Sequence, residues 1–335
     1  MDILNALVVF LNFVFIPAAA YGAQLALGAL GVTLIYGILR FSNFAHGDTM
    51  AFGTAVVILM TWGLQSLGIT LGPLPTALLA LPFGIAATAA LVLATDRAVY
   101  RFYRVKKAAP IILVMASVGV MFVMNGLTRL LIGVSEYRFD DGARFIINVR
   151  DFRDWTGLPE GLALRSTQAL TLVVAVIVVA ALFWFLNRTK SGKAMRAYSD
   201  NEDLALLSGI DPERVVRLTW IIAASLATIA GTLYGLDKSF KAFNYFQILL
   251  PIFAAAIVGG LGSPLGAIAG GFLVAFSEVA VTYPWVKVVG YIAPGYEPGG
   301  LMQLLGTEYK FAVSFVILIV VLLFRPTGLF RGKSV

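Results

Sequence analysis

Residues 166–187 read STQALTLVVAVIVVAALFWFLN, and this stretch decides the class of fold. It carries no charged side chain and is rich in valine, leucine and aromatic residues. An α-helix needs about 20 apolar residues to cross the hydrocarbon core of a bilayer, because each residue advances the helix by about 1.5 Å. The stretch therefore predicts a membrane-spanning α-helix.

Similar apolar stretches recur along the chain. The candidate spans are 18–40, 47–66, 73–96, 108–133, 166–187, 216–236, 247–262, 264–282 and 309–324. The spans 247–262 and 264–282 are short and rich in glycine, which favours discontinuous or re-entrant helices. A short apolar stub before Pro17 is either a half-span or an interfacial helix. We expect an all-α fold, a polytopic transmembrane helical bundle of about 8–10 membrane segments including short or re-entrant helices.

The composition supports a membrane protein and excludes several kinds of site. Of the 335 residues, 59% are hydrophobic and 13% are charged, whereas a soluble domain has about 45–50% and about 25%. The chain has no cysteine, which excludes disulfides and thiolate metal sites. His46 is the single histidine, which excludes a multi-histidine metal site. We predict no catalytic residues, no metal and no cofactor for this chain.

The basic residues predict the orientation of the chain. The net charge of +7 comes from lysines and arginines in short loops between apolar runs, a membrane pattern rather than a nucleic-acid-binding face. Loops 97–107 and 188–217 are strongly basic, whereas acidic residues outnumber basic ones in 134–165. The positive-inside rule then places the basic loops in the cytoplasm, the N-terminus in the periplasm and the C-terminus in the cytoplasm. No linker or shift in composition divides residues 1–335, so we expect a single transmembrane domain.

The polar segment 188–217 lies between two spans. Residues 193–207 are predicted to form one polar helix, and Gly209 fits the end of that helix. Asp211 and Pro212 fit the cap and first position of the next helix. The short helix is either a docking element for a cytoplasmic partner or an ordinary amphipathic connector.

Other features are candidates for a translocation pathway. The polar residues NFAHGD at 43–48 form either a break between two helices near an inner gate or a tight turn. The glycines at 259–271 either let two helices pack closely or form a flexible break that lines the path. The polar groups within the spans are Gln24, Asn125, Arg129 and Glu278. Glu278 is the strongest candidate among them, and its alternative role is a structural bond to a neighbouring helix. The pathway or gate candidates are Asn43, His46, Gly47, Gly260, Gly262, Ser263 and Glu278.

Five segments together resemble a known family. They are NFAHGD at 43–48, SGKAMRAYSDNEDLALLSGI at 191–210, AGTLYG at 230–235, AAIVGGLGSPLGAIAGG at 255–271 and FRPTGLF at 324–330. In this order, and over nearly the whole chain, they resemble the permease of bacterial branched-chain amino-acid ABC importers of the LivH type. Segment 283–308 departs from the family, because it is longer than usual and rich in proline, glycine and aromatic residues.

The resemblance implies a multi-pass permease of the bacterial inner membrane that forms the translocation pathway for branched-chain or other hydrophobic amino acids. The implied partners are a second homologous permease of the LivM type, two cytoplasmic ATPase subunits, a periplasmic substrate-binding protein, the lipid membrane and a small solute, but no nucleic acid. ATP hydrolysis is expected on the separate subunits. Residues 191–210 would hold the coupling helix, with coupling residues Lys193, Arg196, Ala197, Asp200, Leu207 and Gly209. Urea, short amides and organic or aromatic acids are alternative solutes within the family.

Two other classes of function stay open on the sequence alone. An ion-coupled secondary transporter or channel also uses broken helices, but it needs ionisable residues deep in its spans, and few are present. An intramembrane enzyme needs a nucleophile with a base, or metal ligands, on facing spans. One histidine and no cysteine leave little for that chemistry.

Overall fold

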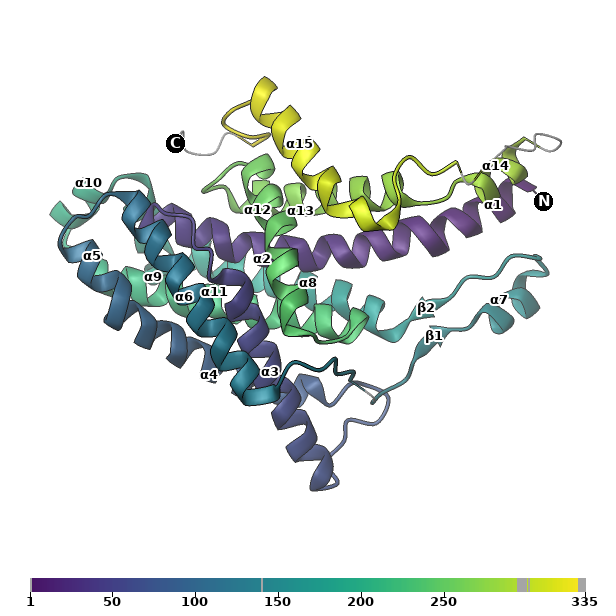
Figure 1. The fold of residues 1–335 in the computed structure, drawn as a ribbon, viewed down its shortest axis with the longest axis horizontal. Coiled ribbons are helices and arrows are strands. Elements are labelled where there is room, and N and C mark those ends of the chain that lie inside the picture. Colours follow the sequence, from purple (N-terminus) through teal and green to yellow (C-terminus); the bar gives the residue numbers. More distant parts are fainter. Residues whose placement is uncertain (1, 140, 294–299, 301, 331–335) are drawn as a thin grey trace.

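The computed structural model describes residues 2–139, 141–293, 300 and 302–330, and these residues are mostly helical (Figure 1). The first span is longer than the sequence predicts. Helix α1 (Asp2–Phe10), the π-helical turn η1 (Leu11–Phe15) and α2 (Ile16–Leu39) form one continuous helix of 38 residues. The stub before Pro17 is therefore not a separate element. The wider π turn precedes Pro17, whose ring cannot donate a helical hydrogen bond, so the chain continues without ending the helix.

A second extension corrects the predicted cytoplasmic loop 97–107. Helix α3 (His46–Ser66) matches the prediction, but α4 (Ala77–Thr95) continues through the π turn η2 (Asp96–Tyr100) into α5 (Arg101–Val105). The true connection to α6 (Pro110–Ile132) is only 106–109. The prediction failed because the basic residues of 97–105 were taken as a loop, whereas they lie on a helix that projects beyond the apolar span.

The remaining spans lie close to their predicted places. They are α8 (Ser166–Arg188), α11 (Pro212–Lys238), α12 (Ala242–Gly259), α13 (Pro264–Thr282) and α15 (Lys310–Phe324), the last preceded by the 3₁₀ turn η3 (Thr307–Tyr309). In the described part of the chain, nine helices are long and apolar enough to cross a membrane. The predicted polytopic, all-α membrane fold is confirmed.

One end of the molecule carries short elements outside the spans. Strands β1 (Phe145–Ile147) and β2 (Leu164–Arg165) pair antiparallel and frame helix α7 (Val149–Thr156). Nearby, α14 (Val286–Ile292) packs against α1, and the rings of Phe10 and Trp285 stack with centroids 6.3 Å apart. In Figure 1 these elements lie at the right, whereas α9 and α10, described below, lie at the far left.

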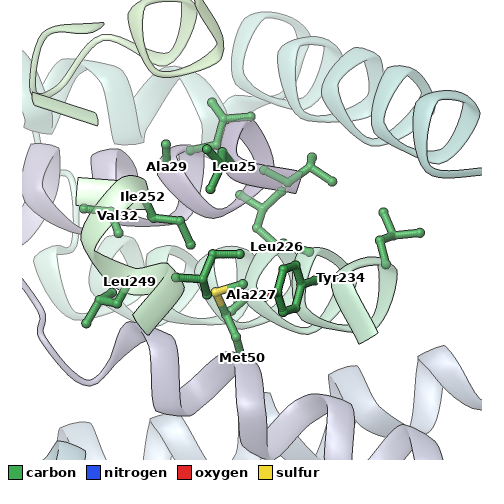
Figure 2. Packing of buried hydrophobic residues seen from close by; sticks show 14 of the residues in the cluster. Leu25, Ala29, Val32, Met50, Leu226, Ala227, Tyr234, Leu249 and Ile252 are labelled. Atoms are coloured by element: carbon green, nitrogen blue, oxygen red, sulfur yellow. The ribbon is translucent and has the colours of Figure 1, made fainter. Parts of the chain in front are cut away.

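The core of the bundle is built around α2 and α11. Leu25, Ala29 and Val32 of α2 belong to the same buried cluster as Leu226 and Ala227 of α11 (Figure 2). Small residues at such contacts let helix backbones approach closely, which is how helices gain packing energy where lipid removes the hydrophobic drive. By contrast, only 11% of the most apolar stretch of the α15 span is buried within the chain, compared with 67% for the spans of α11 and α12.

Glycines bring α12 and α13 together. A Cβ added at Gly266 would collide with the carbonyl oxygen of Gly259, and one at Gly270 with that of Ala255. Gly262 does not continue this stripe, because α13 begins only at Pro264 and Gly262 lies in the preceding turn with φ +84°. Each of the two helices is continuous from end to end, and the break between them is the turn 260–263.

Candidate coupling and pathway sites

The predicted helix 193–207 is two helices. Helix α9 (Lys190–Asp200) ends at Asn201, whose backbone is extended (φ −151°), and α10 (Glu202–Leu207) starts there. The Asn201 side chain accepts a hydrogen bond from the Leu204 amide at 3.0 Å, which caps α10. The prediction of one helix missed this break because asparagine was counted as a helical residue rather than as a cap.

Helix α9 has one buried and one exposed face. Gly192, Met195 and Tyr198 are buried against the bundle. A Cβ at Gly192 would lie 2.6 Å from Cα of Leu186, so glycine lets α9 sit directly on the end of α8. The predicted coupling residues all lie on the exposed side of α9 or in the exposed segment after it: Lys193, Arg196, Ala197, Asp200, Leu207 and Gly209.

The short helix α10 presents apolar side chains to the outside. Leu204 is 61% exposed and Leu207 is 86% exposed, although apolar side chains that lie outside the spans are usually buried. Gly209 has φ +79°, as predicted for the residue that ends a helix in the left-handed region. The Asp211 side chain accepts from the Glu213 amide at 3.0 Å, so the predicted cap of α11 is also present.

Helix α9 is fastened to the inner end of α2. The Ser199 hydroxyl donates to the carbonyl of Gly37 at 3.1 Å, and the Arg40 guanidinium donates to the carbonyl of Ser199 at 2.6 Å. A groove of about 170 Å³ lies beside this contact and is lined by residues that include Arg196 and Gly262. The structure thus brings a predicted coupling residue and a predicted gate residue to one groove.

The segment 43–48 is buried. Asn43 Oδ1 accepts from the Ala45 amide at 3.2 Å and from the Tyr100 hydroxyl at 3.3 Å. His46 is 1% exposed, and its Nε2 has no hydrogen-bond partner in the described residues. Gly47 packs on α12, since a Cβ there would lie 2.6 Å from the carbonyl oxygen of Tyr245. The segment is therefore a turn between α2 and α3 that is packed into the bundle, and its role at a gate stays a prediction.

Asp48 lies one residue further into α3 and is fully buried. Its Oδ1 accepts from Asn125 Nδ2 of α6 at 2.7 Å, whereas its Oδ2 has no partner among the described residues. The bond explains Asn125, one of the polar groups that the sequence placed inside a span. It also fixes the break against α6.

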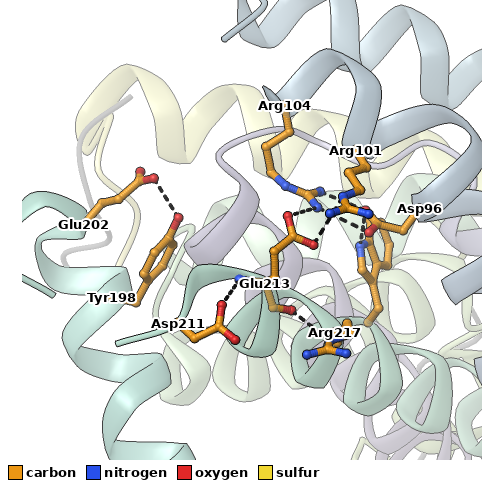
Figure 3. Close-up of polar contacts among 9 residues, drawn as sticks. Asp96, Arg101, Arg104, Tyr198, Glu202, Asp211, Glu213 and Arg217 are labelled. Atoms are coloured by element: carbon orange, nitrogen blue, oxygen red, sulfur yellow. Dashed lines mark hydrogen bonds and ion pairs between the residues drawn. The ribbon is translucent and has the colours of Figure 1, made fainter. Parts of the chain in front are cut away.

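An ion-pair cluster joins the break to the start of α11 (Figure 3). Arg104 binds Asp96 at 2.8 Å and Glu213 at 3.4 Å. The Trp220 indole donates to the same Asp96 at 2.9 Å. Tyr100 stacks on Trp220 with centroids 5.3 Å apart, and Tyr100 also donates to Asn43, as described above. The sequence carries no local signal for this cluster, because Asp96 and Arg104 are 8 residues apart rather than three or four, and Glu213 and Trp220 lie on another helix.

Figure 3 also shows the bond that stabilises the junction of α9 and α10. The Tyr198 hydroxyl donates to the Glu202 carboxylate at 2.6 Å. Burial and this bond raise the pKa of Tyr198 well above its usual value, so its hydroxyl keeps the proton that it donates. Tyr198 thereby holds the first turn of α10 against α9.

The glycine-rich turn 260–263 is covered by the C-terminal segment. The amides of Leu329 and Phe330 donate to the carbonyls of Val258 and Gly259 at 2.9 Å and 3.1 Å. Ser263 caps α13, since its hydroxyl accepts from the Gly266 amide at 3.2 Å. Two segments that are far apart in the sequence, 255–271 and 324–330, are therefore bonded to each other beside this turn.

Glu278 lies in the outer part of α13 and is 1% exposed. It is hydrogen-bonded to the hydroxyl of Ser314 in α15, which is the structural bond that the sequence left open as an alternative. Its other oxygen, Oε2, has no hydrogen-bond partner among the described residues. The structure therefore shows the bond, and a role of Glu278 in a pathway stays a prediction.

The end of the molecule that carries α7 and α14 also carries a cluster that the sequence did not indicate. Glu160 accepts from Lys287 at 2.9 Å and from the Tyr291 hydroxyl at 2.7 Å. Burial alone would raise the pKa of Glu160, but these bonds and the Lys287 charge lower it below its usual value. The bonds tie the loop 157–163 to α14, in the segment 283–308 that departs from the family pattern.

The chain is similar to known proteins over nearly its whole length. The family described as "Branched-chain amino acid transport system / permease component" matches residues 15–322. LivH of Escherichia coli, a high-affinity branched-chain amino acid transport system permease protein, is 29% identical over 94% of this chain and 93% of its own length. BraD of Pseudomonas aeruginosa, which has the same description, is 28% identical over 94% of both chains. The corresponding LivM protein of Escherichia coli is 32% identical over 113 residues, which cover 32% of this chain and 27% of LivM. Since the family match runs through every span from α2 to α15, this chain belongs to the family of permease components of branched-chain amino acid transport systems.

Proposed function

We propose that this chain is the inner-membrane permease subunit of an ATP-driven importer for branched-chain or other hydrophobic amino acids. The whole of 1–335 acts as one permease domain, and 188–217 is the coupling loop within it. The match to the permease family over residues 15–322 carries the proposal. The relatives LivH and BraD are named for branched-chain amino acids, which favours that class of solute over urea, amides or organic acids.

A second permease, two cytoplasmic ATPase subunits and a periplasmic binding protein complete the proposed importer. The partial likeness to LivM supports a homologous partner permease. The exposed apolar tip of α10 supports docking on an ATPase, because exposed leucines beside a charged helix face are typical of a covered interface. In this arrangement α9 and α10 lie in the cytoplasm and α1 and α14 lie in the periplasm.

The mechanism follows from how α9 and α10 are fastened. Closure of the ATPases would push on α10 and on the exposed face of α9. Ser199 and Arg40 pass that motion to the inner end of α2. The Asp96–Arg104–Glu213 cluster connects the start of α11 to Tyr100 and thus to Asn43 at the packed break. The inner end of the pathway would open and close as these contacts shift together.

Co-purification from native membranes tests this proposal. Tagged chain should bring an ATPase and a second polytopic protein, and the Leu207→Asp variant should recover at least about tenfold less ATPase, because a charge replaces an apolar anchor. Leu67→Asp is the matched control, since Leu67 is 75% exposed at the opposite end of α3 from the break and should leave recovery unchanged. Recovery of the chain alone, or uptake that survives ATP depletion but collapses with the ion gradient, would favour a channel or secondary transporter instead.

A further inference from the structure

The outer half of the bundle contains a group of charged and polar side chains that the proposed coupling mechanism does not use. They come from four helices: Tyr21 and Gln24 of α2, Tyr234 and Asp237 of α11, Glu278 of α13, and Lys310 of α15. Electrostatic interactions link Glu278 with Tyr21, Tyr234 and Lys310, and link Lys310 with Asp237. Charged groups inside membrane spans are costly, and they commonly mark a path for a solute.

Several acceptor atoms in this group lack a partner. Glu278 is 1% exposed, Tyr21 is 6% exposed and Gln24 is 0% exposed. By distance and angle, Glu278 Oε2, Tyr21 OH and Gln24 Oε1 form no well-aligned hydrogen bond with the described residues, although Tyr21 and Glu278 lie close enough to interact with each other. A buried acceptor without a partner costs free energy unless a ligand or another donor satisfies it. Such a set of acceptors fits a ligand that brings its own N–H donors.

The cation of the group is also not paired with a carboxylate. Lys310 Nζ lies 4.8 Å from the centroid of the Tyr21 ring and 4.9 Å from that of Phe311. None of the ion pairs in the described part of the chain includes Lys310 or Glu278. Glu278 and Lys310 therefore lie close enough to interact electrostatically but do not form an ion pair with each other.

An outer cavity lies against one member of this group. The cavity measures about 590 Å³ and is lined by residues that include Asp237 and Lys238 together with Arg138, Arg144 and Arg165. Asp237 pairs with Lys238 at 3.2 Å and has a second oxygen without a hydrogen-bond partner among the described residues. Asp237 also interacts electrostatically with Lys310, which does not line the cavity. Because α15 carries Lys310 and Ser314 and is the least buried span, it is the element that can move most easily to open the group.

We infer that Glu278 and Lys310, with Tyr21 beside them, form an outer binding site for a zwitterionic amino acid. Glu278 and the Tyr21 hydroxyl accept hydrogen bonds from the substrate ammonium, and Lys310 donates to its carboxylate. The two opposite charges suit a solute that is neutral overall but charged at both groups, and a urea or amide would leave them unpaired. The inference deepens the proposed function and rests on it, because it assumes that the solute passes through this chain.

Two conservative substitutions distinguish a role of Glu278 in substrate binding from a purely structural role. Glu278→Gln removes the negative charge but keeps an oxygen that can accept from Ser314, whereas Ser314→Ala removes the bond and keeps the charge. The full complex with its binding protein is reconstituted in proteoliposomes, and ATP-driven uptake of radiolabelled L-leucine is measured. We expect uptake to fall about tenfold or more for Glu278→Gln and to stay within about twofold of the wild type for Ser314→Ala. Normal uptake with Glu278→Gln, or an equal loss in both variants, would overturn the site.

A binding measurement on the purified complex without the binding protein examines each charge by itself. The probes are L-leucine, 3-methylbutylamine, which lacks the carboxylate, and 4-methylpentanoate, which lacks the ammonium. Ligands that bind the native state raise its thermal stability. We expect Glu278→Gln to lose the response to the amine and Lys310→Met to lose the response to the carboxylate. Identical responses in wild type and variants would overturn the site. If the wild-type complex transports no leucine, the proposed function fails, whereas this binding measurement still tests the site.

Discussion

Single residues in the coupling segment act through backbone conformation as much as through their side chains. Gly209 has φ +79° and no atom within 4 Å of the position that a Cβ would take. Space therefore does not require glycine there, but the left-handed backbone does, since other residues adopt it at a cost of about 1–2 kcal/mol. Gly209 directs the chain from the end of α10 into the cap of α11.

At Gly209, we expect valine to uncouple transport from ATP hydrolysis. The strained turn would move α10 relative to α11, so ATP turnover would continue while uptake falls several-fold, and membrane insertion would stay normal. Gly209→Asn is the control, because asparagine tolerates the left-handed region better than a β-branched residue. The ratio of solute taken up to ATP hydrolysed in proteoliposomes gives the answer, and an unchanged ratio for Gly209→Val would show that the turn has no part in coupling.

At the scale of elements, the contact of α12 with α13 shows how glycine sets the distance between two helices. Gly266 and Gly270 of α13 lie directly against backbone carbonyls of α12. Gly271, on a neighbouring face of α13, packs on α2, since a Cβ added there would lie 2.6 Å from the amide nitrogen of Ala26. No side chain fits between backbones at such separations. The turn at 260–263 and the C-terminal segment then hold the inner ends of these helices together.

We predict that Gly270→Val destabilises the protein by about 1–3 kcal/mol, the usual cost of overpacking. The added atoms would push α13 away from the carbonyl of Ala255 and separate the two helices. Gly126→Val is the matched control, because Gly126 lies on α6 with nothing within 4 Å of an added Cβ. Thermal unfolding of the two purified variants in detergent compares them, and equal midpoints would refute the packing argument.

The whole molecule is polarised along the direction of its spans. The elements α9 and α10 lie at one end, and α7, α14 and the N-terminal end of α1 lie at the other (Figure 1). The basic residues of 97–107 and of 188–196 lie on the α9 side, and the positive-inside rule assigns such a side to the cytoplasm. The proposed docking of ATPases on α10 requires the same orientation.

Labelling of single cysteines can test this orientation directly, because the chain has no cysteine of its own. We expect a membrane-impermeant maleimide to label Arg153→Cys in intact spheroplasts and to label Lys106→Cys only after permeabilisation. Both positions are exposed, so access to the membrane side rather than burial decides the result. Labelling of Lys106→Cys in intact spheroplasts would reverse the proposed topology.

Local properties of the sequence determined the spans, the positive φ of Gly209 and the cap at Asp211. The length of an apolar stretch and the residues that cap a helix can both be read from neighbouring positions. A membrane-spanning helix makes its backbone hydrogen bonds within its own segment, so its existence does not depend on distant residues. The sequence also identified Glu278 as an ionisable residue inside a span. It could not decide between a structural bond and a pathway role, because the bonding partner Ser314 lies on another helix.

Tertiary structure decided what depends on distant residues. The π turn at Asp96–Tyr100 carries the helix through the predicted loop, and Asp96 meets Arg104 two turns along the same helix and Trp220 of α11. Asn201 divides the predicted coupling helix through a local cap, but the burial of Gly192 and Tyr198 of α9, with α10 mostly exposed, came only from packing. The position of Lys310 beside Tyr21 and Glu278 also came only from packing of α15. Spans follow from the requirement of lipid along one helix, whereas sites follow from contacts between helices that no local pattern encodes.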